Sequence, residues 1–387
     1  MDSRWKRYLL NINKFLQDDV RGHHIQFCLN DASVNFYTNE ESILMETKAY
    51  LQPHMDILPE CNSKSWNVIA FHDSTYFQTF ADNARDIVIT DSGGNPTIGK
   101  LTRDNSGNIF ILNLRSGNLI IKENALKRIS IIGTLEQSLY SGYCSWLSGD
   151  AHNVIRQLLR IELENNGALV LHGAAALCGD RGIALVGDKG CGKTTCLISL
   201  ILKRGAKYVC NDRFFLWVRN NRFYLNGWPT TFRIGLGTLS HFDELHSLIP
   251  QEKRKSIFMM PSEMRVSFHG KVVLVPQQIS DLFKNQSKKQ IELRVLIFPQ
   301  YEPRGDVFKI ARCDYKQARQ ILLRNIFSPI DKNHPNWLSL ERKSKEELNR
   351  NCGRVISRLI LSTNSYLLTG HGATTELIKC LDNLLLS

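Results

Sequence analysis

The chain has 387 residues, of which 43% are hydrophobic and 22% charged, and its formal net charge is +12. This composition excludes an intrinsically disordered protein. No apolar run reaches the roughly 18 residues of a membrane span, which argues against a membrane protein. The length predicts two domains. The basic excess lies beyond residue 150 and suits nucleotides or acidic partners; nucleic acid is not expected, because no nucleic-acid-binding motif is present.

Ten cysteines are scattered along the chain without a C-x-x-C pair. Such spacing is typical of free thiols in a reducing compartment. Residues 1–7 are basic, but no apolar segment of a secretory signal follows them. We therefore expect a cytoplasmic protein that does not engage a membrane.

The first 150 residues carry mainly strand patterns. Apolar runs at 24–29 and 33–37 predict a hairpin, and helical spacing predicts helices over 2–19 and 39–51. Further short apolar runs predict strands at 66–71, 86–89, 108–112 and 118–121. We predict a smaller, sheet-rich, mostly antiparallel α+β domain over residues 1–150, with substrate recognition as its candidate role.

The second domain is predicted over residues 151–387. It begins with a helix at 153–163, and apolar runs predict strands at 169–171 and 183–186. Residues 195–204 have helical spacing and end in basic residues before Gly205, which is typical of a helix terminus. A short strand at 206–210 then leads to Asn211 and Asp212. An aspartate at the end of such a strand can bind Mg²⁺ or accept a proton.

A phosphate-binding loop follows the strand at 183–186. Its spelling is G-x-x-x-x-G-K-[ST], and it consists of Gly187, Asp188, Lys189, Gly190, Cys191, Gly192, Lys193 and Thr194. The glycines allow backbone N–H groups to turn toward one anion at the start of a helix. Lys193 is expected to contact the terminal phosphates and the Thr194 hydroxyl to bind Mg²⁺. We predict that these eight residues and Thr195 bind the nucleotide; a glycine-rich turn without a ligand is the alternative.

The run from Leu171 to Asp212 resembles the HPr kinase/phosphorylase family, and more closely its shorter HPr-kinase-like members, which include tailoring kinases of peptide gene clusters. That family places a histidine in an H-G or H-A dipeptide fifteen residues before the first loop glycine, as His172 stands before Gly187. It also ends the next strand with two acidic residues, the position that Asn211 and Asp212 hold here. Weaker similarity continues at 227–237 and 271–276.

The resemblance implies an α/β HPr-kinase-like P-loop domain that uses ATP and Mg²⁺ to phosphorylate a hydroxyl, serine of a peptide or protein being the expected acceptor. It implies catalytic roles for His172, Lys193 and Asp212, with Thr194 and Asp212 as Mg²⁺ ligands. Because Asn211 cannot take a proton, either Asp212 alone combines metal binding with proton acceptance or the activity is altered. A nucleotide-binding regulator or assembly factor, a small-metabolite kinase, GTP as donor, and a homo-oligomer all stay open.

Overall fold

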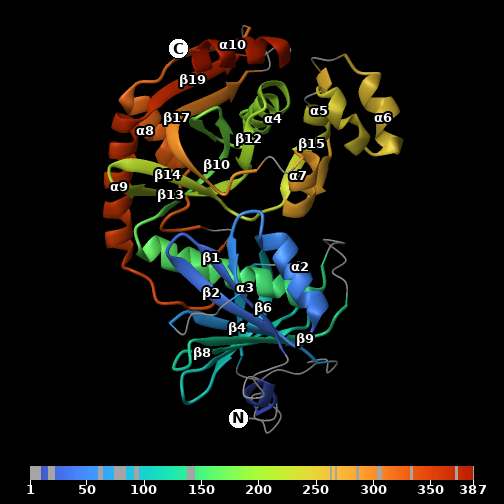
Figure 1. Ribbon diagram of the computed structural model, residues 1–387, viewed down its shortest axis with the longest axis vertical. Coiled ribbons are helices and arrows are strands. Elements are labelled where there is room, and N and C mark those ends of the chain that lie inside the picture. Colours follow the sequence, from blue (N-terminus) through green and yellow to red (C-terminus); the bar gives the residue numbers. More distant parts are fainter. Residues whose placement is uncertain are drawn as a thin grey trace. The chain divides into compact units, whose positions relative to one another are not determined.

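The protein is mixed α/β with several sheets. The structure is a computed structural model that describes residues 10–15, 22–59, 64–73, 84–90, 96–136, 144–261, 264–265, 268–284, 287–302, 307–331, 334–370 and 374–386. Two compact units divide the chain: residues 1–166 with 330–343, and residues 167–329 with 344–387 (Figure 1). The division therefore differs from the predicted one at residue 150.

The first unit contains a nine-stranded sheet of order β3-β1-β2-β4-β9-β8-β7-β6-β5. Its strands are β1 (His23–Leu29), β2 (Ala32–Thr38), β3 (Asp56–Leu58), β4 (Trp66–His72), β5 (Arg85–Thr90), β6 (Pro96–Arg103), β7 (Ile109–Asn113), β8 (Leu119–Glu123) and β9 (Arg128–Gly133). The prediction of a mostly antiparallel sheet is confirmed, since only two of the strand pairings described for it are parallel. Strands β2 and β4, and β4 and β9, are parallel, because intervening elements cross over between them.

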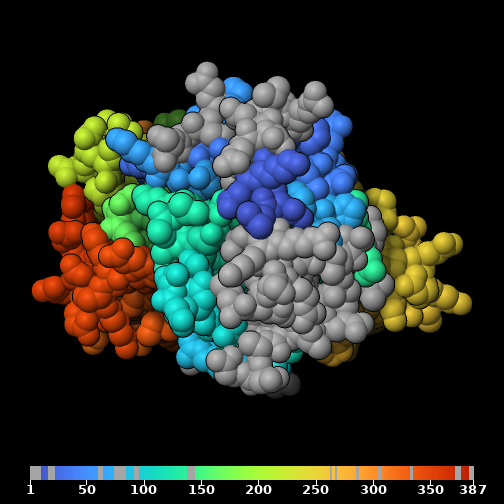
Figure 2. Space-filling model, turned by 90° about the horizontal axis from the view of Figure 1, so that it is seen from below, coloured from blue at the N-terminus to red at the C-terminus, as the bar shows by residue number. Residues whose placement is uncertain are grey.

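Both faces of this sheet are covered at β7, β8 and β9, because every residue of these strands is buried, Lys122 and Glu123 included. Helices α2 (Glu41–Leu51) and α3 (Trp146–Asn165) pack together on one face. On the other face, Ile12 is buried with Ile69, Ile121 and Ile132. Residues 10–15 are helical and lie at the surface of the unit, dark blue in Figure 2. The rest of the helix predicted at 2–19 lies outside the described residues.

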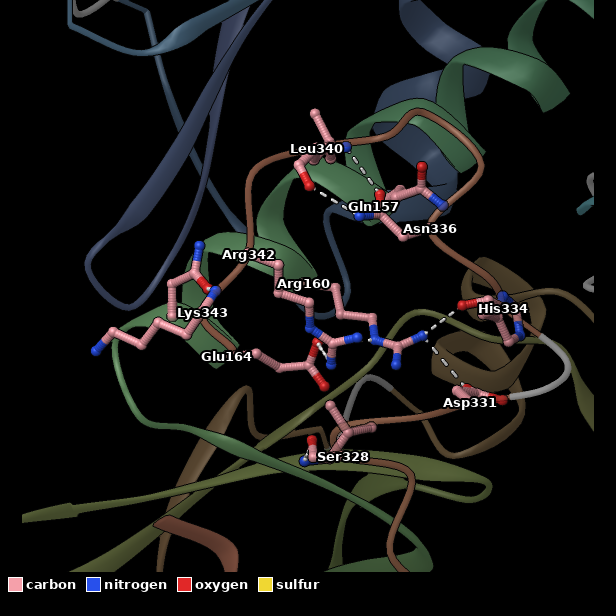
Figure 3. A network of polar contacts seen from close by, with 12 residues as sticks. Gln157, Arg160, Glu164, Ser328, Asp331, His334, Asn336, Leu340, Arg342 and Lys343 are labelled. Atoms are coloured by element: carbon pink, nitrogen blue, oxygen red, sulfur yellow. Dashed lines mark hydrogen bonds and ion pairs between the residues drawn. The ribbon is translucent and has the colours of Figure 1, made fainter. Parts of the chain in front are cut away.

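Residues 330–343 return to the first unit from far along the chain, and we call them the strap. Gln157 of α3 binds the strap backbone at both ends of its amide, donating to Pro335 O at 2.7 Å and accepting from Leu338 N at 2.9 Å. Arg160 donates to His334 O at 2.9 Å and lies 3.4 Å from Asp331 Oδ2 (Figure 3).

Buried charges complete the attachment of the strap. The Glu164 carboxylate accepts a hydrogen bond of 2.7 Å from Arg342 and lies 3.4 Å from Arg160 Nε (Figure 3). Lys122 on β8 donates to Leu338 O and Ser339 O, both at 2.9 Å. Helix α3 therefore belongs with the first sheet rather than with the loop domain, which is why the predicted boundary lies too early.

The second unit is built on two long strands that change partners along their length, β10 (Leu169–Cys178) and β17 (Gln290–Tyr301). The other strands are β11 (Arg181–Val186), β12 (Lys207–Cys210), β13 (Arg213–Arg219), β14 (Arg222–Gly227), β15 (Phe232–Gly235), β16 (Lys271–Leu274), β18 (Lys309–Arg312) and β19 (Asn364–Gly370). Strand pairing runs β11-β10-β13-β14-β17 and returns to β11, while β19 and β18 extend the sheet beyond β17. β15 and β16 form a separate two-stranded sheet.

The described helices of the second unit are α4 (Lys193–Arg204), α5 (Leu236–Leu239), the 3₁₀ helix η1 (Asp243–Leu248), α6 (Gln251–Phe258), α7 (Pro276–Leu282), α8 (Tyr315–Arg324), α9 (Lys345–Ser362) and α10 (Thr374–Leu386). Helices pack against both sides of β11. Ile183 and Leu185 pack in the cluster that includes α4, whereas Ala184 and Val186 pack in the cluster of α8 and α9. In the part of the chain that is described, none of the helices is both long and apolar enough to cross a bilayer.

Candidate active site

The predicted phosphate loop joins β11 to α4, in the order of strand, loop and helix that the sequence indicates. Gly190 and Gly192 adopt φ values of 86° and 100°, where a Cβ would be strained. Gly187 is not one of the positive-φ glycines; it is needed for space, because a Cβ there would lie 2.8 Å from Cys191 Sγ. Gly190 and Gly192 are thus required for their backbone conformation, and Gly187 for the space beside Cys191.

Lys193 is folded into the loop that precedes it. Its Nζ donates to Gly187 O at 2.7 Å and to Asp188 O at 2.9 Å, and the residue is only 8% exposed. Burial lowers the pKa of the Lys193 ammonium, while Cys191, Asp212 and Asp188 oppose that shift. The loop is also tied to β17, since Tyr301 N donates to Cys191 O at 3.1 Å. A cation is therefore held at the centre of a fixed loop.

The start of α4 leaves its first N–H groups available to an anion. Gly192 is the N-cap, and among the described residues no side chain caps this helix. Thr194 is half-buried in the first turn, and Thr195 Oγ1 lies 3.5 Å from Thr238 Oγ1 of α5. Asp188, Lys189 and Gly190 are exposed at the tip of the loop. A helix N-terminus combined with a buried lysine is a suitable receptor for phosphate oxygens.

His172 lies beside this loop because of strand register. β10 and β11 form an antiparallel hairpin in which Gly173 pairs with Val186, so His172 and Gly187 follow on at the same end of the ladder. The spacing of fifteen residues is thus the length of a hairpin that begins at the histidine and ends at the loop. The loop follows the carboxyl end of β11 and Asp212 that of β12, but His172 lies within β10, where that strand changes its partner from β13 to β11.

Asp212 lies on the other side of His172, between β12 and β13. Its backbone oxygen accepts a hydrogen bond of 3.0 Å from Gly173 N, which fixes the corner against β10. Asp212 Oδ1 lies 3.8 Å from His172 Nε2, and Oδ2 accepts from Arg213 Nε at 3.3 Å. Arg213 is itself the register partner of His172 across the β10–β13 ladder. One carboxylate is therefore flanked by an imidazole and a guanidinium.

His172 is held in an environment that favours its neutral form. Burial lowers its pKa, and the charges of Lys193 and Arg213 act in the same direction. The Asp212 carboxylate and a hydrogen bond with the Asn325 side chain act against this shift. These mutual effects place His172, Lys193 and Asp212 in one electrostatic cluster. A neutral imidazole can accept a proton from a hydroxyl group.

Asn211, which replaces an acidic residue of the resembling family, has a local structural role. Its side-chain oxygen accepts a hydrogen bond from the buried Tyr208 hydroxyl, and its nitrogen donates to Thr231 O at 3.3 Å. Both ends of the amide are therefore used inside the unit. A carboxylate could accept from Tyr208 but could not donate to Thr231.

Two site residues were not expected from the sequence, Asn325 and Phe327. Phe327 stacks on His172 with ring centroids 5.6 Å apart, and the Arg213 guanidinium lies 4.4 Å from the same ring. Asn325 donates to Asp188 Oδ1 at 3.2 Å. They follow the loop by more than a hundred residues in a stretch without a motif, so only the pairing of this segment with β10 reveals them.

The predicted metal ligands offer oxygen atoms, the donors that Mg²⁺ prefers. Thr194 supplies a hydroxyl and Asp212 a carboxylate that is 44% exposed. Within the described ranges no group of three or more His, Cys, Asp or Glu residues is arranged to hold a metal ion. One hydroxyl and one carboxylate would suit only an ion that takes its remaining ligands from phosphate oxygens and water, as Mg²⁺ does at nucleotide sites. Burial raises the pKa of Cys191 in the loop, which agrees with a passive thiol there.

No family model and no curated protein matches the chain. Among solved structures, the HPr(Ser) kinase/phosphatase from Coxiella burnetii is similar at 15% sequence identity and a TM-score of 0.26. That match covers 56% of this chain and 96% of the other. The likeness is distant, so the function has to be inferred from the site itself.

Proposed function

We propose that the protein is an ATP- and Mg²⁺-dependent kinase that transfers the γ-phosphoryl group to a hydroxyl, serine of a peptide or protein being the acceptor. The observation that carries this proposal is the position of His172 and Asp212 beside the phosphate loop, with Nε2 and Oδ1 3.8 Å apart. A loop that only binds a nucleotide needs no proton acceptor beside it. His172 and Asp212 are groups that could accept a proton at this position.

The loop would bind the phosphates through its N–H groups and the Lys193 ammonium. Lys193 now donates to two loop carbonyls and would exchange these for phosphate oxygens, which are stronger acceptors. Thr194 and Asp212 would hold Mg²⁺. When bound, the ion would neutralise charge on the phosphate oxygens. Such transfers depend mainly on positioning and charge stabilisation.

His172 and Asp212 would act on the acceptor hydroxyl. The oxygen of the acceptor hydroxyl would form a bond to the γ-phosphorus, and the bond from that phosphorus to the β,γ-bridging oxygen would break. The hydroxyl proton would pass to Nε2 of His172 or to the Asp212 carboxylate. The neutral state favoured at His172 supports the first route. Arg213 lies against the same carboxylate and would hold it in place.

A second candidate is a nucleotide-binding regulator or assembly factor, and Asn211 favours it because the site has one acid where the resembling family has two. Incubation with γ-labelled ATP and a cell lysate separates the candidates. Label on a protein or peptide supports the kinase, label on a small molecule supports a metabolite kinase, and tight binding without label supports the regulator. Label retained only in ATP, with no binding, contradicts all three.

The remaining assignments follow from the kinase proposal. The first unit is assigned substrate recognition and the second the chemistry. Neither a membrane nor nucleic acid is required as a partner, and the cytoplasm, where ATP and reduced thiols coexist, is the proposed location. In the described part of the chain every cysteine is a free thiol, which is consistent with that compartment.

A further inference from the structure

The long strand β17 changes its partner near its start, and a cavity lies at that place. β14 pairs with β17 up to Glu292, whose partner is Tyr224, and β19 begins to pair at Val295, opposite Asn364. A cavity of about 410 Å³ is lined there by residues of β14, β17 and the end of α9 (Figure 1). Arg294 also lies at an irregularity of the β11–β17 ladder, so it has a partner in none of the described ladders.

This cavity is separate from the phosphate loop. Tyr301, the last residue of β17, donates to Cys191 of the loop, whereas the cavity lies at residues 292–294 of the same strand. Because a strand rises by about 3.3 Å per residue, Arg294 and Tyr301 are separated by roughly 23 Å. A small molecule bound in the cavity would therefore lie outside the nucleotide site.

Two arginines give the cavity a place for a carboxylate. Arg222 Nη1 lies 3.3 Å from Glu292 Oε2, and Arg294 Nε lies 3.5 Å from Glu292 Oε1. Arg294 Nη1 also lies 3.4 Å from Asp180 Oδ2. Each guanidinium has five N–H groups, so both keep donors that no described residue uses. Such donors suit the planar carboxylate group.

Two asparagines in the cavity wall add further donors. The side-chain oxygen of Asn221 accepts from Arg358 at 2.9 Å, and that of Asn364 accepts from Arg312 at 2.8 Å. The amide nitrogens of both asparagines are therefore left for another acceptor. The two additional arginines also make the surroundings of the cavity more positive, which favours a carboxylate over a neutral group.

The same cavity has a place for an ammonium group. The Glu292 carboxylate is 29% exposed, and its contacts with the two arginines leave lone pairs that can accept further hydrogen bonds. Helix α9 ends at Ser362 in the cavity wall, and the C-terminal end of a helix carries a partial negative charge. Leu361 beside it is 78% exposed, so an apolar group could pack there.

We propose that this cavity binds a free α-amino acid with an apolar side chain. Arg222 and Arg294 would hold its carboxylate, Glu292 and the end of α9 its ammonium group, and Leu361 would pack on its side chain. An α-amino acid carries both charges on one carbon, which matches a site where both kinds of partner line one cavity. Phosphate would contact the arginines but would also lie against the like charge of Glu292. The inference does not depend on the proposed kinase function, because no residue of the phosphate loop takes part.

Isothermal titration with L-leucine and two analogues tests the two charge contacts. Leucinamide lacks the carboxylate and N-acetylleucine lacks the ammonium group. We expect L-leucine to bind and each analogue to bind at least about tenfold more weakly, as for loss of a hydrogen bond between charged groups. Failure of L-leucine to bind at millimolar concentration overturns the proposal. Equal binding of N-acetylleucine would show a general anion site and would also overturn it.

Two variants assign the contacts to their residues. Arg294→Gln should bind L-leucine about tenfold more weakly and no longer distinguish it from leucinamide. Glu292→Gln should no longer distinguish L-leucine from N-acetylleucine. Arg319→Gln, at an exposed position of α8, is the matched control and should bind as the wild type does. Thermal melts identify the folded variants, and only these are titrated.

Unchanged affinity for L-leucine in folded Arg294→Gln and Glu292→Gln overturns the assignment of the site, as does an equal loss in Arg319→Gln. The binding result is independent of phosphoryl transfer. If the protein transfers no phosphate but binds L-leucine with the expected selectivity, the proposed function fails and the amino-acid site stands. If it transfers phosphate but does not bind L-leucine, the reverse holds.

Discussion

The hydroxyl of Tyr208 donates a hydrogen bond to the side-chain oxygen of Asn211. Because the nitrogen of the same amide donates to Thr231 O, an aspartate at this position would set a carboxylate against a carbonyl oxygen. We expect Asn211→Asp to lower the free energy of unfolding by about 1–3 kcal/mol, measured by urea denaturation at pH 8. Equal stability of the two proteins would show that the amide has no such role.

Asn211→Asp also tests the chemistry of the site. If the asparagine limits the enzyme to one direction, the variant should gain ATP hydrolysis or reverse phosphorolysis, measured by release of labelled phosphate. An inactive wild type together with an active variant would instead favour the regulator.

Lys193→Met is expected to weaken binding of Mg²⁺-ATP by at least about tenfold, because it removes a charge-assisted contact to the phosphates. At an ATP concentration of 100 times Kd the wild type should gain about 2.7 kcal/mol from the ligand, and the variant about half as much. Thermal melts with and without ligand measure this. Lys203→Met, at the other end of α4 and paired at the surface with Glu244, is the control. Equal stabilisation of wild type and Lys193→Met would contradict the role of this lysine.

Asp212→Asn should remove phosphoryl transfer and leave much of the nucleotide affinity, since the phosphates are held mainly by the loop. The change keeps the shape of the side chain but removes its charge beside His172 and Arg213. Isothermal titration with Mg²⁺-ADP and a transfer assay measure the two effects. Asp180→Asn, at the exposed hairpin turn, should change neither. Transfer at the normal rate in Asp212→Asn would exclude this carboxylate from the mechanism.

His172→Ala is expected to reduce transfer by roughly 10²-fold to 10⁴-fold, the usual contribution of proton transfer to a positioned side chain. Imidazole added to the assay should restore part of the rate, because the deletion leaves space beside Asp212. Rescue distinguishes a chemical role from a structural one. An unchanged rate, or a loss that imidazole does not relieve in a folded variant, would count against His172 as the proton acceptor.

The pH dependence of stability should report on His152 in the first unit. This side chain is completely buried against Tyr50, and burial together with the charge of Arg156 lowers its pKa from 6.5 to about 3. Below pH 6.5 the unfolded chain therefore binds a proton at His152 that the folded chain does not bind. This contribution to the free energy of unfolding is fully present above pH 6.5 and is lost as the pH falls toward 3.

At pH 5 the loss due to His152 should be about 2 kcal/mol relative to pH 8. Urea unfolding at pH 8, 6 and 5 measures it, and His152→Asn should remove this part of the slope. The exposed His24→Gln is the control and should leave the slope as it is. If His152→Asn keeps the full slope, other groups cause the acid sensitivity.

The sequence predicts the loop, its strand and its helix well because these signals are local. The glycines, the lysine and the apolar spacing of α4 lie within about twenty residues. His172 is indicated only by the resemblance to a family with a histidine fifteen residues before the loop, and the β10–β11 hairpin accounts for that spacing. The direction of β10 could not be predicted from the sequence, because the same apolar run suits a parallel or an antiparallel strand.

What the sequence does not predict depends on contacts over long distances in the chain. Asn325 and Phe327 reach His172 only because their segment pairs with β10. Likewise, the assignment of α3 to the first unit depends on the strap, which binds Arg160 and Gln157 from some 170 residues away. No local pattern in α3 indicates its partner, so the predicted boundary at residue 150 falls inside the helix instead of after it.

The strap also restricts how this protein can have been assembled. Gene segments are exchanged as continuous stretches, yet the first unit consists of residues 1–166 and 330–343. A single recombination between them would separate Glu164 from Arg342 and leave Lys122 without the carbonyls of Leu338 and Ser339. The first unit is therefore not a module that one crossover could pass to another protein. It can be inherited intact only together with the second unit, which interrupts it in the sequence.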